Sequence, residues 1–378
     1  MTDRREGIVC GARVLITGGL GYLGSRLTDY LFERGITCRV YDPGFFRDGL
    51  LCPPAHEPDV MFTDARDIED RDLEGIDTVV HFAGISNDPF GSLRPERVYD
   101  PTREYAARFA RLCKARGVRF IFASSCSVYG IGREPLVTEQ SATSPQTPYS
   151  RNKLEIESDL LAMSDERFAP IMFRFATVFG LSPRIRFDVV INMLAGMAVA
   201  TGRITLNSNG LAWRPHVHID DVCQAVWLGI TRKPTLSGPL VLNVGDTANN
   251  CQVIDVARVV QRAVPGSRLS FLHEEAPSAS LDIVRDRKIQ DGVDTRTYRV
   301  GFDAIRRAFP DFQCAWPISR GIEQLVGQLR ALGLTEPQFQ DIRFHRLQQL
   351  DALFKSGRLT EDVRWAAAEA HAPTVARR

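Results

Sequence analysis

The stretch ITGGLGYLGSRL, residues 16–27, contains four glycines and no proline, and it lies where the first apolar run gives way to a helical pattern. Because each glycine adds to the conformational entropy lost on folding, this density indicates that something must approach the backbone closely. The preceding run, RVLIT at 13–17, is short and apolar, which is typical of a buried strand. After it, Leu23, Leu27 and Leu31 recur at helical spacing. The stretch therefore predicts a strand, a glycine turn and a helix in succession.

Further apolar runs predict that this unit repeats as alternating strands and helices. The predicted strands lie at 37–42, 60–64, 77–84, 118–125 and 170–180, with a helix at about 102–116. Strands that alternate with helices of this length indicate a parallel, doubly wound sheet. The ligand of such a sheet binds at the carboxyl ends of its strands.

In that setting the glycine turn indicates a dinucleotide site. The spacing TGxxGxxG places Thr17, Gly18, Gly21 and Gly24 where a pyrophosphate reaches N–H groups at the helix N-terminus. Asp42 ends the second predicted strand, and a carboxylate there binds the ribose hydroxyls and repels a 2′-phosphate. The turn therefore favours NAD over NADP. The alternative is a glycine helix boundary beside an unrelated aspartate.

A second group of residues suits proton transfer. Ser125 ends the strand at 118–125, and Tyr149 and Lys153 are four residues apart, so they share one face of a helix. An ammonium beside a phenol stabilises the phenolate and lowers its pKa. A tyrosinate can then take a proton from a substrate hydroxyl while hydride leaves the adjoining carbon, and Ser125 can hydrogen-bond the same oxygen. The alternative is a tyrosine–lysine pair on a helix surface.

Several motifs together resemble those of the extended short-chain dehydrogenase/reductase family, in its nucleotide-sugar epimerase/dehydratase/reductase branch. The resemblance runs from about Val14 to about Gly327 and is carried by TGGLGYLG, TDARD (63–67), VVHFAG (79–84), SSCSVYG (124–130), Tyr149 with Lys153, RFATVFG (174–180) and WRPHVHIDDV (213–222). It implies an α/β fold with a Rossmann doubly wound parallel sheet and a smaller mixed α/β substrate lobe, and a helical C-terminal extension follows. The expected ranges are 10–180 for the NAD-binding domain, 181–334 for the substrate lobe and 335–378 for the extension. The substrate lobe is expected to be interleaved with the NAD-binding domain.

The resemblance also implies which residues form the site. The implied catalytic residues are Ser125, Tyr149 and Lys153. The implied cofactor-binding residues are Thr17, Gly18, Gly21, Tyr22, Leu23, Gly24, Asp42, Asp64, Ala65, Phe82, Ala83, Gly84, Ser124, Tyr149 and Lys153. The implied substrate-binding residues are Asn192, Arg214 and Arg296, and guanidinium groups suit a diphosphate because each pairs two oxygens. Arg184 and Arg186 either contact the substrate or form a solvated pair of surface charges.

Two departures from the family pattern narrow the expected reaction. Where 4,6-dehydratases of this family carry an Asp-Glu pair, this chain has Cys126 and Ser127, so no carboxylate is supplied there. Cys126 is interpreted as a small buried hydrophobe, with an acid/base thiol as the alternative; Ser127 is the other candidate acid/base group. We therefore expect an NAD-dependent nucleotide-sugar 4-epimerase. The alternatives are a dehydratase or 4-ketoreductase of the same family, or a non-catalytic NAD-binding sensor.

Composition excludes other classes of partner. The net charge of +1 argues against a nucleic-acid or acidic-membrane partner, and no apolar stretch at the start suits a signal peptide. Scattered cysteines without a CxxC motif predict reduced thiols and a cytoplasmic location. His216, His218, Asp220 and Asp221 lack a recognised metal-ligand spacing, so we expect no metal.

The resemblance implies a homodimer that binds a nucleotide-diphosphate sugar. The stretch at 335–370 predicts one or two amphipathic helices, whose apolar stripe docks on the body of the protein or on a partner subunit. That stripe consists of Phe344, Leu347, Leu350 and Phe354.

Overall fold

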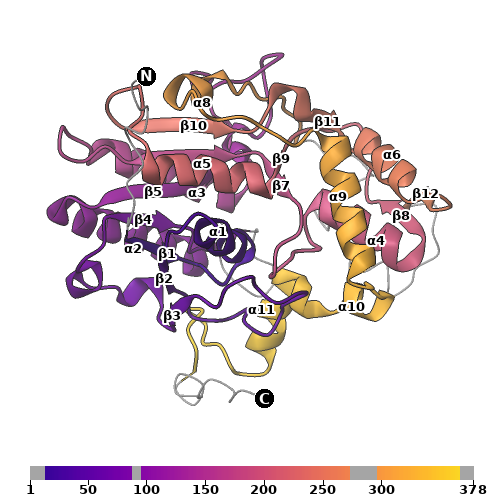
Figure 1. Ribbon diagram of the computed structural model, residues 1–378, viewed down its shortest axis with the longest axis horizontal. Helices are drawn as coiled ribbons and strands as arrows, with labels where there is room; N and C mark the ends of the chain where they lie inside the picture. Colours follow the sequence, from indigo (N-terminus) through magenta and orange to yellow (C-terminus); the bar gives the residue numbers. More distant parts are fainter. Residues whose placement is uncertain (1–12, 87–94, 273–295, 367–378) are drawn as a thin grey trace, which may run out of the picture.

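A seven-stranded parallel sheet organises the larger part of the chain, with strand order β10-β6-β5-β4-β1-β2-β3 (Figure 1). The computed structural model describes residues 13–86, 95–272 and 296–366. The strands of this sheet are β1 (Val14–Thr17), β2 (Cys38–Tyr41), β3 (Asp59–Met61), β4 (Thr78–His81), β5 (Arg119–Ser125), β6 (Ile171–Phe175) and β10 (Leu240–Val244). Strand order reverses direction at β1, which lies between β2 and β4, and this reversal is where doubly wound sheets bind their ligands.

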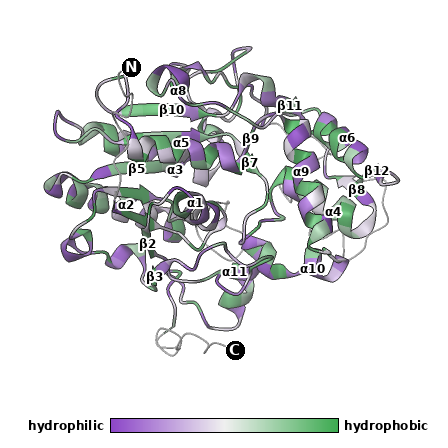
Figure 2. Ribbon diagram, in the orientation of Figure 1, coloured by the Kyte–Doolittle hydropathy of each residue, from purple (hydrophilic) through white to green (hydrophobic). Residues whose placement is uncertain are grey.

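Helices cover both faces of this sheet because side chains alternate along each strand. Val14 and Ile16 of β1 enter one core with Leu27, whereas Leu15 enters the opposite core with Phe109. The covering helices are α1 (Tyr22–Phe32) and α5 (Ile219–Thr231) on the first face, and α2 (Pro95–Arg116) and α3 (Pro148–Ala162) on the second. Hydrophobic residues concentrate in the strands between these helices (Figure 2). The predicted Rossmann-type fold class is confirmed.

A smaller lobe lies beside the sheet and has its own apolar core, which includes Leu194, Val260 and Leu325 (Figure 1). Its helices are α4 (Val190–Thr201), α6 (Val253–Ala263) and α9 (Ile318–Ala331), and its strands are β8 (Arg203–Leu206) and β12 (Arg268–Phe271). A three-stranded sheet, β11-β9-β7, joins the two parts. It consists of β7 (Thr177–Phe179), β9 (Trp213–His218) and β11 (Asn250–Gln252), and α8 (Asp303–Ala308) packs near β10.

Two elements differ from the sequence prediction. The single strand expected at 170–180 divides at Ala176, whose N–H bonds to Val244 O, and the chain then passes from the large sheet into the small one. Helix α2 begins at Pro95 rather than near 102. Proline usually marks the start of a helix or breaks it, but Pro101 lies inside this one, so the predicted start was too late. Residues of the predicted 181–334 range serve both parts, because β10 returns to the large sheet. The predicted domain ranges stay a prediction.

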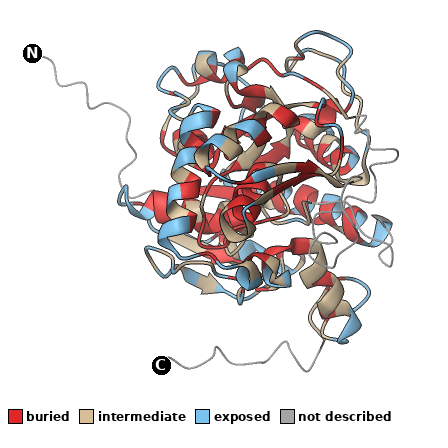
Figure 3. Cartoon of the chain, turned by 90° about the vertical axis from the view of Figure 1, so that its right-hand side faces the viewer, coloured by how far each residue is buried: buried red, intermediate tan, exposed pale blue. Residues whose placement is uncertain are grey.

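The C-terminal extension packs on the body of the protein. It contains α10 (Glu336–Gln340) and α11 (Arg346–Lys355), and α11 lies below the sheet between β3 and α10 (Figure 1). Leu350 and Leu353 of α11 are buried with Val98 and Tyr99 of α2. Figure 3 shows the buried interior of the body and, below it, the C-terminal extension, which is partly exposed. No helix in the described ranges has both the length and the apolar character needed to cross a membrane.

Candidate active site

The glycine turn between β1 and α1 packs so tightly that two of its positions admit no side chain. Gly18 has φ 74°, and a Cβ placed on it would lie 2.8 Å from Ala83 N. A Cβ on Gly24 would lie 2.4 Å from Gly18 O. Both obstacles are backbone atoms, which cannot turn aside as a flexible side chain can. The turn is thereby pressed against the segment that follows β4.

Gly21 forms an open cradle at the N-terminus of α1. It is the N-cap residue, and no side chain caps the helix there. The first amides of a helix have no intrahelical acceptor, so the N–H groups that follow Gly21 are suited to an anion. A Cβ on Gly21 would meet only Gly18 O at 3.2 Å and Arg346 Nη2 at 3.9 Å. These features fit the pyrophosphate of a dinucleotide.

Asp42 lies beside this turn, directly after β2. It is buried, and its carboxylate accepts N–H bonds from Leu20 at 3.1 Å and from Gly44 at 2.7 Å. Burial raises the pKa of this carboxyl, while those two bonds and the guanidinium groups of Arg346 and Arg184 lower it. A carboxylate has about four lone-pair sites, so two remain for ribose hydroxyls.

The ends of β1 and β4 are joined by a buried polar contact. Thr17 Oγ1 lies 2.8 Å from His81 Nδ1 and also accepts the Ala83 N–H at 3.3 Å. Burial lowers the pKa of His81 to about 3, so the imidazole is neutral. The Thr17 hydroxyl therefore holds two strand ends together. Phe82, Ala83 and Gly84 follow on the same edge as the glycine turn.

Asp64, expected to bind the cofactor, already makes contacts within the protein. Its carboxylate makes an ion pair with Arg66, with Oδ2 2.6 Å from Nη2. Arg66 also donates to the carbonyl oxygens of Asp362 and Val363 in the C-terminal extension. Ala65 is buried beside Asp64. The segment that follows β3 is thus joined to the C-terminal extension at residues 362 and 363.

The expected catalytic residues lie together. Ser125 ends β5, and its hydroxyl hydrogen-bonds the Tyr149 phenol from the first turn of α3. Thr147 caps α3 and fixes where that turn begins. Lys153 Nζ lies 5.7 Å from the centre of the Tyr149 ring and donates to Ala123 O at 2.8 Å. The surface-pair alternative does not hold, because Lys153 is buried.

The charges that act on the phenol differ from those expected. Burial raises the pKa of Tyr149, whereas the Ser125 hydrogen bond and the guanidinium groups of Arg186 and Arg346 lower it. Burial also lowers the pKa of Lys153 to about 8. Arg346 was not expected here, because no motif or spacing connects it to Tyr149 along the sequence. Only the packing of α11 brings it to the site.

The two residues that follow β5, Cys126 and Ser127, offer no carboxylate. Cys126 is 1% exposed and its Sγ donates to Arg174 O at 3.2 Å, so the thiol points into the core. Burial raises the pKa of this thiol far above its usual range, which argues against an acid/base role. Ser127 Oγ is buried without a hydrogen-bond partner in the described part of the chain. Ser124 instead donates to Glu157.

Arg184 and Arg186 are buried, so the surface-charge alternative is wrong for both. Arg186 binds both carboxylate oxygens of Asp188, at 2.8 and 2.9 Å, and donates to Ser86 Oγ at 2.7 Å. Arg184 donates to Ile185 O, but its Nε has no partner among the described residues. Burial lowers the pKa of Arg184 to about 10.

Of the other predicted substrate residues, Arg214 and Arg296 are neighbours, whereas Asn192 is enclosed within the protein. Arg214 on β9 donates to the carbonyl oxygen of Arg296, so these two residues are neighbours. Asn192 is fully buried, accepts the Gly180 N–H at 2.9 Å and donates to Tyr22 Oη at 3.2 Å. Its amide therefore joins the lobes and is not open to a substrate. Tyr22 donates to Gly180 O, so its side chain is also used internally.

The histidines of β9 belong to the interior of the protein. His216 and His218 are buried, and burial lowers their pKa to about 3 and about 4. Within residues 13–86, 95–272 and 296–366, no group of three or more His, Cys, Asp or Glu is arranged to hold a metal ion.

Known proteins resemble this chain in sequence. A model described as "NAD dependent epimerase/dehydratase family" matches residues 14–245. The UDP-glucose 4-epimerase of Azospirillum brasilense is 25% identical over 353 residues, which cover 88% of this chain and 98% of the relative.

Two solved structures share the fold. The NAD-dependent NDP-hexosamine 5,6-dehydratase TunA has a TM-score of 0.70 and 23% identity, covering 85% of this chain and 98% of its own. The Thermus thermophilus UDP-glucose 4-epimerase in complex with NAD has a TM-score of 0.66 and 21% identity, with coverages of 84% and 99%.

Proposed function

Because the chain belongs to the NAD dependent epimerase/dehydratase family and NAD is its cofactor, we propose that it is a nucleotide-sugar epimerase that inverts C4. The observation that supports this most directly is the partly buried Tyr149 phenol, which is hydrogen-bonded to Ser125 at the end of β5. When bound, NAD supplies a hydride acceptor that takes the hydrogen of the sugar carbon and returns it to the opposite face.

In this proposal the residues of the chain handle the proton. Tyr149 Oη takes the proton of the C4 hydroxyl and later gives it back, and Ser125 hydrogen-bonds the same sugar oxygen. Arg186 and Arg346 favour the phenolate, since each places a positive charge near it. Lys153 Nζ, anchored on Ala123 O, lies 5.7 Å from the centre of the Tyr149 ring.

We also propose that Arg214 and Arg296 bind the diphosphate of the substrate. The hydrogen bond from Arg214 to the Arg296 carbonyl places these residues next to one another. Among the other predicted residues, Arg186 lies close enough to act on Tyr149 and suits the sugar end of the substrate. We leave Asn192 out of this set because its amide is occupied within the protein.

The residues that follow β5 support epimerisation over water loss. A dehydratase needs an acid and a base close to the sugar, and here Cys126 points into the core while Ser127 offers only a hydroxyl. The relatives named UDP-glucose 4-epimerase support the same choice.

Product analysis tests the proposed reaction. The purified protein is incubated with UDP-glucose, UDP-N-acetylglucosamine, dTDP-glucose or GDP-mannose, and the products are examined by NMR and mass spectrometry. We expect one of these sugars to give a C4 epimer of unchanged mass. A product lighter by one water would indicate a dehydratase and would contradict the proposal.

Replacing the phenol separates an enzyme from a sensor. Tyr149→Phe is expected to lower kcat by about 10²–10⁴-fold with NAD still bound, because the proton acceptor is gone. Tyr41→Phe is the matched control, since its hydroxyl bonds Asp72 away from the site. An unchanged rate in Tyr149→Phe, or no turnover of any nucleotide sugar by the wild-type protein, would favour the non-catalytic alternative.

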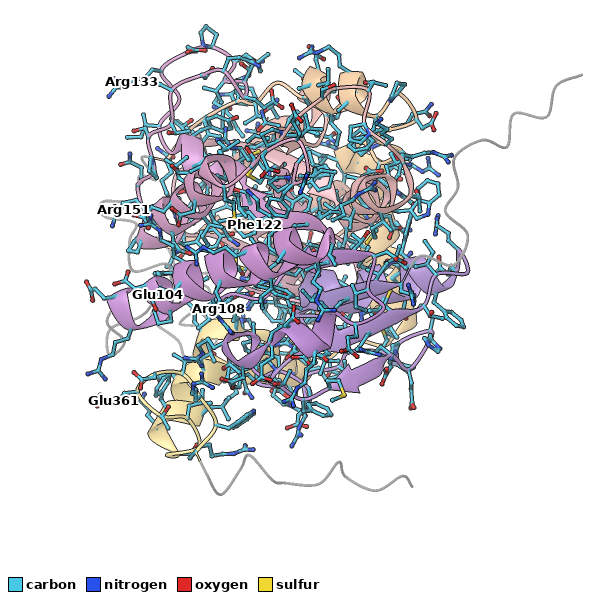
Figure 4. The ribbon with its side chains drawn as sticks, turned by 90° about the vertical axis from the view of Figure 1, so that its left-hand side faces the viewer. Glu104, Arg108, Phe122, Arg133, Arg151 and Glu361 are labelled. Carbon is cyan, nitrogen blue, oxygen red and sulfur yellow. The ribbon has the colours of Figure 1, made fainter. Side chains whose placement is uncertain are left out.

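Finally, we propose a cytoplasmic homodimer. Helices α2 and α3 lie side by side on one face of the sheet, and Glu104 and Arg151 project outward from them (Figure 4). The described cysteines are all free thiols, as expected in a reducing compartment. Analytical ultracentrifugation tests the assembly, and a monomer at all concentrations would contradict it.

A further inference from the structure

Residues 341–366 lie against the segments that follow β2 and β3. We call residues 341–366 the C-terminal cap; they lie beyond residues 14–245, which the family model matches. Trp365 donates from its indole N–H to Pro43 O, and its ring lies 5.1 Å from that of Phe45, just after β2. Arg364 makes an ion pair with Asp67 at 2.6 Å. The cap thus contacts the segments that follow β2 and β3, where adenosine is expected.

Arg346 reaches from the start of α11 under the cap to the glycine turn. It is 9% exposed, and its Nη1 donates to Ser86 Oγ beyond β4. Its Nη2 lies 3.9 Å from the position of a Cβ on Gly21, at the N-terminus of α1. Its Nε is buried and has no partner in the described ranges. A donor that is buried without an acceptor is costly, so this nitrogen indicates a missing acceptor.

The charges around Arg346 point to an anion of more than one charge. Arg346 and Arg184 both lie over the Phe46 ring, at 5.2 and 5.1 Å from its centre, and the Nε of Arg184 also has no partner there. Burial, together with the neighbouring charge of Arg186, lowers the pKa of Arg346 to about 9. Asp188 pairs with Arg186, and Asp42 is held by backbone amides. The Nε–H groups of Arg346 and Arg184 are therefore available to bind phosphate oxygens.

We propose that Arg346 binds the pyrophosphate of NAD from the side opposite the N-terminus of α1, and that the C-terminal cap encloses the cofactor. Planar guanidinium groups suit phosphate oxygens because they donate two parallel hydrogen bonds. In this arrangement the dinucleotide leaves only when the cap separates from Pro43 and Asp67. The inference requires that NAD binds and is independent of which sugar carbon reacts.

Cofactor exchange tests the role of Arg346 without measuring activity. The protein as purified is mixed with excess 1,N6-etheno-NAD, and the rate of NAD release is followed by fluorescence. Arg346→Gln is expected to release NAD about tenfold faster or more, because a charge-assisted hydrogen bond is lost. Lys355→Gln removes a charge from the exposed side of the same helix and should exchange at the wild-type rate.

Competition then separates pyrophosphate binding from a general loosening of the cap. ADP-ribose and adenosine each compete with etheno-NAD, and the ratio of their affinities is measured. Only ADP-ribose carries the pyrophosphate, so Arg346→Gln should reduce its advantage over adenosine about tenfold relative to the wild type. Trp365→Ala should accelerate exchange while keeping the wild-type ratio of the two competitors. Wild-type exchange and an unchanged ratio in Arg346→Gln would overturn the assignment, and tighter binding would show that Arg346 competes with the pyrophosphate.

A measurement on the wild-type protein covers the case in which Arg346→Gln fails to fold. Hydrogen exchange of residues 346–366 is compared with and without added NAD. The amides of α11 and of the segment around Trp365 should become more protected when NAD is present. Equal protection in both conditions would overturn the proposal that the cap encloses the cofactor.

Discussion

At the scale of single residues, the proposed chemistry depends on one partly buried phenol and on the cations around it. Tyr149 receives a hydrogen bond from Ser125, and the charges of Arg186 and Arg346, from segments far apart in the chain, lower its pKa. Burial alone would hold the phenol neutral, so the positive charges decide how readily it gives up its proton. The residue next to Ser125 has a different role, because Cys126 is part of the core.

Replacing Cys126 tests that distinction. Cys126→Ala should leave kcat close to the wild-type value and lower the free energy of unfolding by about 1–2 kcal/mol, since it removes a packed thiol from the interior. Steady-state kinetics and urea denaturation measure the two effects. A loss of activity by orders of magnitude with stability intact would assign the thiol a chemical role after all.

At the scale of elements, the site depends on how α1 and α3 are joined to the sheet. The glycine turn fixes α1 against the strand ends through contacts between backbone atoms. Helix α3 is fixed by a buried ion pair in which Arg174 of β6 binds both carboxylate oxygens of Glu157. The second contact keeps Tyr149 and Lys153 aligned with the end of β5.

Alanine at position 24 should damage the turn. Its Cβ would lie 2.4 Å from Gly18 O, so Gly24→Ala should cost about 1–3 kcal/mol of stability and lower the NAD content of the purified protein. Gly327→Ala is the matched control, since this exposed position in α9 has nothing within 4 Å. It should stabilise the protein by about 0.5–1 kcal/mol. Equal effects of the two changes in thermal denaturation would refute the steric argument.

Neutralising the buried carboxylate of α3 should be far more harmful than neutralising an exposed one. Glu157→Gln leaves Arg174 buried beside a neutral group, and we expect a loss of about 3–5 kcal/mol. Asp159→Asn, two residues later, removes an exposed pair with Arg103 and should cost less than about 1 kcal/mol. Chemical denaturation compares the two variants, and similar losses would show that burial does not set the difference.

At the scale of the whole molecule, polar contacts connect segments that are distant in the sequence. Tyr22 of α1 binds Gly180, Arg66 binds Val363, and Asp221 of α5 accepts the Ala315 N–H at 2.9 Å. The other carboxylate oxygen of Asp221, Oδ2, is buried and has no hydrogen-bond partner in the described part of the protein. Burial raises the pKa of Asp221 to about 7.

This pKa predicts how stability changes with pH. Between about pH 4, the ordinary pKa of aspartate, and about pH 7, the folded protein binds a proton at Asp221 that the unfolded chain has lost. The contribution of Asp221 is therefore complete below about pH 4 and is lost as the pH rises through 7. Asp221→Asn should raise the free energy of unfolding at pH 8 by about 2 kcal/mol and flatten this dependence.

A control on α6 isolates the effect of burial. Asp255 is about half exposed, so Asp255→Asn should follow the wild-type pH profile. Urea denaturation at pH 5 and pH 8 measures both variants. If Asp221→Asn lowers stability at pH 8, the assigned protonation is wrong.

The sequence by itself determined the local parts of this protein. The glycine turn, Asp42 after the second strand, and Ser125 with Tyr149 and Lys153 were predictable because each depends on short spacing or on the end of a strand. Parallel strands then bring those ends to one edge of the sheet. The fold class and NAD followed from the same local patterns.

Only the tertiary structure decided what surrounds these residues. It placed Arg346 against the glycine turn, enclosed Asn192 between the lobes, turned Cys126 into the core and bound Asp64 to Arg66. The main reason is that burial and charge at a residue depend on side chains that packing brings from segments remote in sequence. Spacing along the chain carries no record of those contacts.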